Sequence, residues 1–115
     1  MSSLAYKLDI MSRTWIAQFL TKSQFVKKFG DTTLAATECD EKVIFLRLDK
    51  LTFENIAHEL VHAYVDEHSA PTMDLTTDQM EELCADIVAK YAIKIVEQAQ
   101  QTLHAYKVLR GRRVK

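Results

Sequence analysis

The sequence predicts an α+β domain that is mainly helical. Only two glycines and one proline occur among 115 residues, so most of the chain should be regular structure. Long stretches repeat apolar residues at helical spacing, whereas residues 32–49 are rich in β-branched side chains. The length suits one domain, which we place at residues 1–109, followed by a basic, flexible tail at 110–115.

The first thirty residues predict helices. Apolar residues recur there at Leu4, Leu8, Met11, Trp15 and Phe19. Residues 24–29 repeat the pattern before Gly30 ends it. This predicts one broken helix or two short ones, with the aromatic side chains packed in the core.

Residues 32–49 predict a β-hairpin. The segments TTLAATE and KVIFLRLD have strand composition, and Cys39-Asp40-Glu41 lies between them as a turn. The second segment is the more apolar, so we expect its strand to be the more buried.

Two further helices follow. Thr52 is a suitable N-cap for a helix that begins at Phe53, and Pro71 breaks the pattern in SAPTMDL. Thr76 and Gln79 have the spacing of a capping box, which predicts the start of a long C-terminal helix.

Charge and cysteine content narrow the class of protein. Fifteen basic and sixteen acidic residues nearly cancel, so net charge indicates no partner. Cys39 and Cys84 lie far apart, which is typical of a reducing compartment rather than of a disulfide framework. The N-terminal residues resemble neither a secretory signal nor a membrane span, and we therefore expect a cytoplasmic protein without a membrane partner.

The string His58-Glu59-Leu60-Val61-His62 predicts a site for one zinc ion. Histidines four apart lie on one helix face, about 6 Å apart at Cβ, and can converge on one ion. Glu59 would lie beside the open coordination position and accept a proton from zinc-bound water, whose pKa falls to about 7. These are the parts of a metal-dependent hydrolase.

A catalytic zinc usually has three protein ligands, and two residues compete for the third position. Glu82 lies in the string Glu82-Leu83-Cys84-Ala85-Asp86, twenty residues after His62. His68 lies six residues after His62.

The first alternative resembles the gluzincin arrangement of thermolysin-like peptidases, in which H-E-x-x-H is followed by E-x-x-A-D. The resemblance implies that Glu82 is the third ligand and that Asp86 orients His58 by a hydrogen bond. In size and layout, residues 32–92 are closer to the small zincin-like metallopeptidases of phages, prophages and IrrE-like regulators. That resemblance implies a minimal fold with a hairpin, an H-E-x-x-H helix and a long C-terminal helix.

The second alternative is the metzincin pattern, H-E-x-x-H-x-x-G-x-x-H followed by a methionine turn. His68 occupies the position of the third histidine, and Met73 follows it. Val65 stands where that pattern has glycine, and valine does not readily adopt the positive φ of a sharp helix exit. We therefore expect the helix to continue past Val65, which favours Glu82 over His68.

Together these features predict a zinc-dependent peptidase that acts on a peptide or protein, with Glu59 as general base. The alternative is an inactive, zinc-stabilised module that binds and regulates a protein partner. The basic tail, which includes Arg110, is a weaker indication of nucleic-acid binding. Four residues are candidates to stabilise an oxyanion, and the sequence favours none of them: Tyr64, His68, Tyr91 and His104. The sequence also gives no indication of the oligomeric state.

Overall fold

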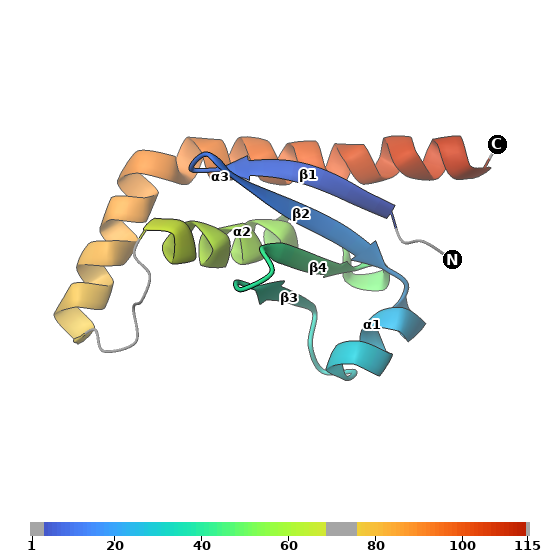
Figure 1. Cartoon of the computed structure of the whole chain (residues 1–115), viewed down its shortest axis with the longest axis horizontal. Coiled ribbons are helices and arrows are strands. Elements are labelled where there is room, and N and C mark those ends of the chain that lie inside the picture. Colours follow the sequence, from blue (N-terminus) through green and yellow to red (C-terminus); the bar gives the residue numbers. More distant parts are fainter. Residues whose placement is uncertain (1–3, 69–75, 115) are drawn as a thin grey trace.

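The computed structural model describes residues 4–68 and 76–114, with side chains as far as residue 110. A four-stranded sheet carries helices on both faces, which confirms the α+β class (Figure 1). The elements, in chain order, are β1 (Leu4–Ile10), β2 (Arg13–Leu20), α1 (Lys22–Phe29), β3 (Ala35–Glu38), β4 (Val43–Arg47), a 3-10 turn (Leu48–Lys50), α2 (Phe53–His68) and α3 (Thr77–Val114).

The prediction of helices before residue 21 is wrong, because β1 and β2 form an antiparallel hairpin there. Residues four apart share a face in a strand as well as in a helix, so the spacing of Leu4 and Leu8, or of Trp15 and Phe19, suits both structures. The intervening residues decide the outcome. Tyr6 lies on the same face as its neighbours two positions away, which is the period of a strand.

A tight turn at Met11 and Ser12 sets the register of this hairpin. Both residues have positive φ, 52° and 68°, and Ile10 pairs with Arg13 across the turn. Two-residue turns of this kind match the twist of the strands they join. The turn therefore places Leu8 opposite Trp15 on the side of the sheet that faces the core.

The predicted hairpin of residues 32–49 is confirmed as β3 and β4, which pair antiparallel. All four residues of β3 are half-buried, whereas four of the five residues of β4 are buried. The strand order is β1-β2-β4-β3, with β2 and β4 parallel, so β1 and β3 are the edges of the sheet.

The two faces of the sheet are covered differently. On one face, α2 and α3 pack over the main core; on the other, α1 covers a smaller cluster of Leu20, Phe25 and Phe45. The main core comprises Leu8, Ile10, Trp15, Ala17, Phe19, Ile44, Leu46, Ile56, Leu60, Ala63, Tyr64, Leu83, Ile87, Ile95 and Ala99. Successive side chains of β4 point to opposite faces of the sheet, so Ile44 packs in the main core and Phe45 packs in the smaller cluster.

The predicted helix starts are confirmed by hydrogen bonds. The Thr52 hydroxyl accepts from the Asn55 amide at 3.1 Å, and Thr76 and Gln79 form a reciprocal capping box. α2 continues without a break past Val65 to His68, as expected for valine at that position.

α3 bends, so that its first turns extend away from the sheet while its later part runs along β1 (Figure 1). The helix continues through Val114 and includes most of the segment we expected to be a flexible tail. Arg110 is exposed there. Among the described helices, none combines the length and apolarity that crossing a bilayer requires.

The largely buried side chain of Glu67 joins the C-terminal end of α2 to the sheet. There the Glu67 carboxylate accepts from Trp15 Nε1 of β2 and from Lys42 Nζ of the β3–β4 turn, each at 2.7 Å. A second ion pair lies before α2: the guanidinium of Arg47 in β4 donates to both carboxylate oxygens of Asp49 in the 3-10 turn and to the backbone carbonyl of Asp31. The contacts of Glu67 therefore hold the C-terminal end of α2 against β2 and the β3–β4 turn.

Changing Ser12 to Gly tests the N-terminal hairpin. Glycine adopts positive φ without steric cost, so the free energy of unfolding should rise by about 0.5–1 kcal/mol in urea melts. The matched control is Ser23→Gly in α1, which should lower it because glycine disfavours helix. Destabilisation by Ser12→Gly as well would contradict the hairpin.

The acid stability of the fold should depend on Glu67. Burial would raise the pKa of this carboxyl, but the hydrogen bonds and charges of Lys42, Trp15 and Arg13 outweigh it and hold the pKa below its usual value. The native state therefore favours ionised Glu67, and its contribution is complete above the unfolded pKa of about 4.3 and is lost as pH falls through the lower folded pKa. In urea melts between pH 7 and pH 3, Glu67→Gln should have a lower free energy of unfolding than wild type at pH 7. Its free energy of unfolding should also fall less than that of wild type as the pH is lowered. An equal change in the exposed control Glu97→Gln would contradict this role.

Candidate metal centre

The rotation of α2 on the sheet decides which of its side chains meet solvent. Its core-facing residues are Ile56, Leu60, Ala63 and Tyr64, all almost fully buried. His58 and His62 lie on the opposite side of the helix and are exposed. Both imidazoles are therefore exposed to solvent on a helix whose opposite side is packed in the core.

The two imidazoles are already arranged as a ligand pair. His58 Nε2 and His62 Nε2 lie 3.3 Å apart. Two nitrogens bound to one tetrahedral zinc at about 2.0–2.1 Å lie roughly 3.3–3.4 Å from each other. The separation matches that of two zinc ligands, and it is also the distance of a hydrogen bond between the two rings.

Glu59 lies beside the pair in a different environment. Its residue exposure is only 7%, and its Oε1 accepts a hydrogen bond from the Thr37 hydroxyl of β3 at 2.7 Å. Its Oε2 lies 3.9 Å from His58 Nε2. That is longer than the separation of two zinc ligands, although the carboxylate is near enough to be grouped with the two imidazoles.

Two hollows meet at Glu59, between α2 and the edge strand β3. One, of about 370 Å³, lies toward the N-terminus of α2, and the other, of about 310 Å³, lies toward its C-terminus. The first is lined by Leu34, Ala35, Glu54, Asn55, His58 and Glu59, and the second by Thr37, Cys39, Glu59, His62, Val65 and Asp66. Because both hollows border β3 and share Glu59, we refer to the two together as the cleft.

Cys39 brings a thiol to the lining of this cleft. Burial raises its pKa, and the charge and hydrogen bond of Asp66 raise it further. The thiol is therefore protonated near neutral pH when no metal is bound.

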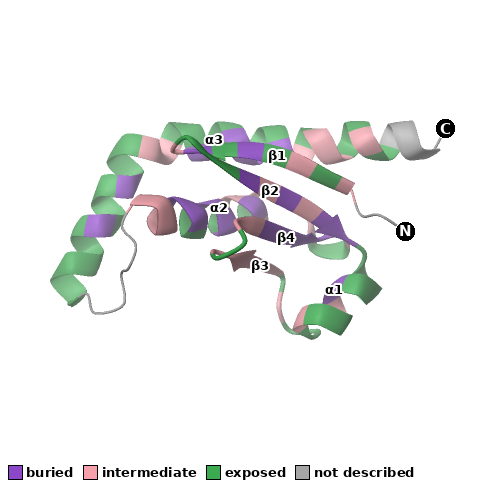
Figure 2. Cartoon of the chain, in the orientation of Figure 1, coloured by how far each residue is buried: buried purple, intermediate pink, exposed green. Residues whose placement is uncertain are grey.

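Glu82 and Asp86 do not join the cluster. Within the described residues, the coordinating atoms that come within 4.8 Å of one another belong to His58, Glu59 and His62. α3 packs through Leu83 and Ile87, which leaves Glu82 and Asp86 exposed on its projecting first turns, where Figure 2 shows mostly exposed residues. Coordination by Glu82 remains a prediction.

His68 does not join it either. Its ring packs edge-on against Tyr91 with centroids 6.5 Å apart, and its buried Nδ1 finds no hydrogen-bond partner among the described residues. Met73, the counterpart of the methionine turn, lies outside the described residues. Tyr64 donates its hydroxyl to Gln98 inside the core, and burial raises its pKa to about 12, so it is not available to stabilise an oxyanion.

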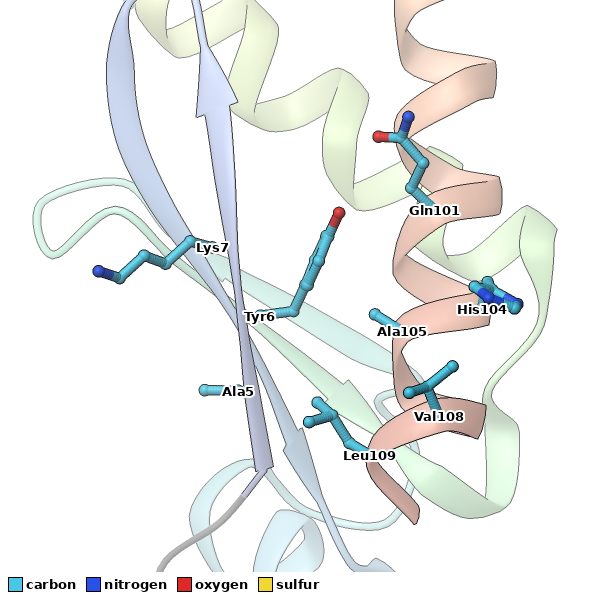
Figure 3. Close-up of a pocket in the computed structure, with 8 residues that line it drawn as sticks. All are labelled: Ala5, Tyr6, Lys7, Gln101, His104, Ala105, Val108 and Leu109. Atoms are coloured by element: carbon cyan, nitrogen blue, oxygen red, sulfur yellow. The ribbon is translucent and has the colours of Figure 1, made fainter. Parts of the chain in front are cut away.

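A separate cavity of about 520 Å³ lies between β1 and the C-terminal half of α3 (Figure 3). Tyr6 points from β1 toward α3, whereas Lys7 points away from the helix. His104 borders this cavity, which places it apart from His58 and His62. The cluster of His58, Glu59 and His62 therefore lies at the cleft along β3 and not at this cavity.

The sequence did not indicate Thr37, Cys39 or Asp66 as neighbours of the site. Thr37 is 22 residues from Glu59, and the β3–α2 packing that joins them has no periodic signature. Asp66 follows His62 by four residues, so the helical spacing alone could have placed it on the same face.

Zinc titration tests the cluster. We expect one zinc per chain, with affinity reduced at least about 100-fold by His58→Ala or His62→Ala and unchanged by His104→Ala. Binding that survives both substitutions would contradict the site. Glu82→Ala and His68→Ala in the same assay decide the third ligand, and we expect only Glu82→Ala to weaken binding.

The geometry of the cluster stands without support from known relatives. Comparisons with protein-family models, curated proteins and solved structures give no match. The resemblance to small zincin-like metallopeptidases therefore remains a prediction carried by the two motifs and by the arrangement of His58, Glu59 and His62.

Proposed function

We propose that the protein is a zinc-dependent peptidase of the small zincin-like kind. The observation that carries the proposal is the 3.3 Å separation of His58 Nε2 and His62 Nε2, with the buried carboxylate of Glu59 next to them. A purely structural zinc site needs no general base, and it is usually closed by four protein ligands. Here both histidines are exposed, which leaves room for a substrate.

The residues divide the chemistry between them. A zinc ion held by His58 and His62 would polarise a peptide carbonyl and make water more acidic. Glu59 Oε2 faces the histidines and would take a proton from the attacking water, then pass it to the leaving amine nitrogen. Oε1 takes no part, because it is bound to Thr37.

The cleft suits an extended peptide. β3 pairs with β4 on one side only, so its outer edge has backbone groups free to pair with another strand. The two hollows lie on either side of Glu59 along this strand. A peptide paired with β3 would place its side chains in both hollows and its backbone beside the histidines.

We assign Glu82 as the third ligand on the spacing of the two motifs. This requires the first turns of α3 to approach α2 more closely than they do here, since Glu82 is exposed and outside the cluster. Asp86, one turn later on the same helix, would then come within reach of His58.

The test is the cleavage of a diverse peptide library by the zinc-loaded protein, followed by mass spectrometry. Glu59→Gln should keep the zinc and lose at least about 100-fold in kcat, because the amide is not a base. Glu97→Gln, on α3, serves as the control and should cleave normally. Undiminished cleavage by Glu59→Gln contradicts the proposal.

The same experiment distinguishes the second candidate, a zinc-stabilised binding module. The observation that favours it is that, in the part of the chain that the structure describes, no histidine, cysteine, aspartate or glutamate beyond Glu59 joins the two histidines. Wild type that binds zinc, cleaves no peptide and does not bind small hydroxamates would support the module. Cleavage that hydroxamates inhibit supports the peptidase.

A further inference from the structure

The contact between Thr37 and Glu59 joins the edge strand to the candidate base. Thr37 Oγ1 lies 2.7 Å from Glu59 Oε1 and 3.3 Å from the Glu59 backbone oxygen. A hydroxyl has one proton, and the nearer, charged oxygen is the stronger acceptor. The hydroxyl therefore donates to the carboxylate.

This bond makes the two carboxylate oxygens unequal. Oε1 is occupied by Thr37, and Oε2 is directed toward the histidines at 3.9 Å from His58 Nε2. Two ligands of one tetrahedral zinc lie roughly 3.3–3.4 Å apart. The distance from Glu59 Oε2 to His58 Nε2 is thus about half an ångström longer than the separation expected for two zinc ligands, whereas the distance between His58 Nε2 and His62 Nε2 matches it.

We propose that Thr37 is a positioning residue that holds Glu59 as a base and prevents it from becoming a zinc ligand. The inference rests on the proposed function of the site. With the hydroxyl bond in place, Oε2 is the oxygen that moves the proton. Without it, the carboxylate is free to swing toward the ion and complete its coordination.

The residue type and its place suit this role. Threonine is branched at Cβ, so its side chain has few rotamers and holds the hydroxyl in place. It lies on β3, a strand paired to β4, rather than on a loop. The same strand borders the cleft, so the residue that orients the base also lies where a peptide would bind.

A cycle of zinc affinities tests the inference without any substrate. Thr37→Val keeps the side-chain shape and removes the donor. It should tighten zinc binding about threefold or more, measured by competition with a chromophoric chelator, because Glu59 gains access to the ion. The gain should disappear in the double variant Thr37→Val/Glu59→Gln. An unchanged affinity in Thr37→Val, or an equal gain when Thr37→Val is added to the Glu59→Gln variant, would overturn the inference.

Kinetics on any peptide that wild type cleaves give the second readout. Thr37→Val should lower kcat by about 10- to 100-fold with little change in KM, and Thr37→Ser should restore most of kcat because it keeps the hydroxyl. Thr14→Val removes an exposed threonine hydroxyl from β2 and should behave as wild type. Equal kcat in the Ser and Val variants of Thr37 would also overturn the inference.

The proposed function and the role of Thr37 fail in different ways. Wild type that binds no zinc or cleaves no peptide contradicts the proposed function. Wild type that does both, with Thr37→Val indistinguishable from Thr14→Val in affinity and kcat, contradicts only the role of Thr37. Thermal melts of each variant show whether a loss comes from unfolding.

Discussion

The packing of α2 against the sheet is the constraint on which the site depends. Burial of Ile56, Leu60 and Tyr64 fixes the rotation of this helix, and the half-buried Glu67 at its far end is bound to β2 and to the β3–β4 turn. Because the helix cannot rotate without exposing these apolar side chains, His58 and His62 must face outward together. The metal-binding geometry is therefore a consequence of core packing.

The same rotation accounts for the burial of Glu59. This residue lies at the boundary between the core face and the histidine face, where β3 packs against the helix. A carboxylate buried without a partner would be costly, and the Thr37 hydroxyl supplies one. One contact thus satisfies a buried charge and also sets the direction in which its free oxygen points.

The parts that could be predicted from sequence are those with local causes. Thr52 and Thr76 begin helices because their hydroxyls meet nearby amides, and His58 and His62 converge because they are one turn apart. The N-terminal hairpin was missed, because a spacing of four suits both strand and helix, and the turn contains no glycine. The Thr37–Glu59 contact depends on how a strand and a helix pack, and the distance between Glu82 and the histidines depends on the bend of α3. Neither has a local signature.

X-ray absorption spectroscopy of the zinc-loaded protein tests the central claim most directly, because it reports the atoms bound to the metal. We expect two imidazole nitrogens at about 2.0–2.1 Å, with oxygen in the remaining positions and no sulfur. A sulfur scatterer at about 2.3 Å would show that a thiol takes part, and a spectrum without imidazole would show that zinc binds elsewhere. A spectrum without imidazole would contradict a metal centre built on His58 and His62, and a sulfur scatterer beside imidazole would contradict the oxygen ligands that we expect in the remaining positions.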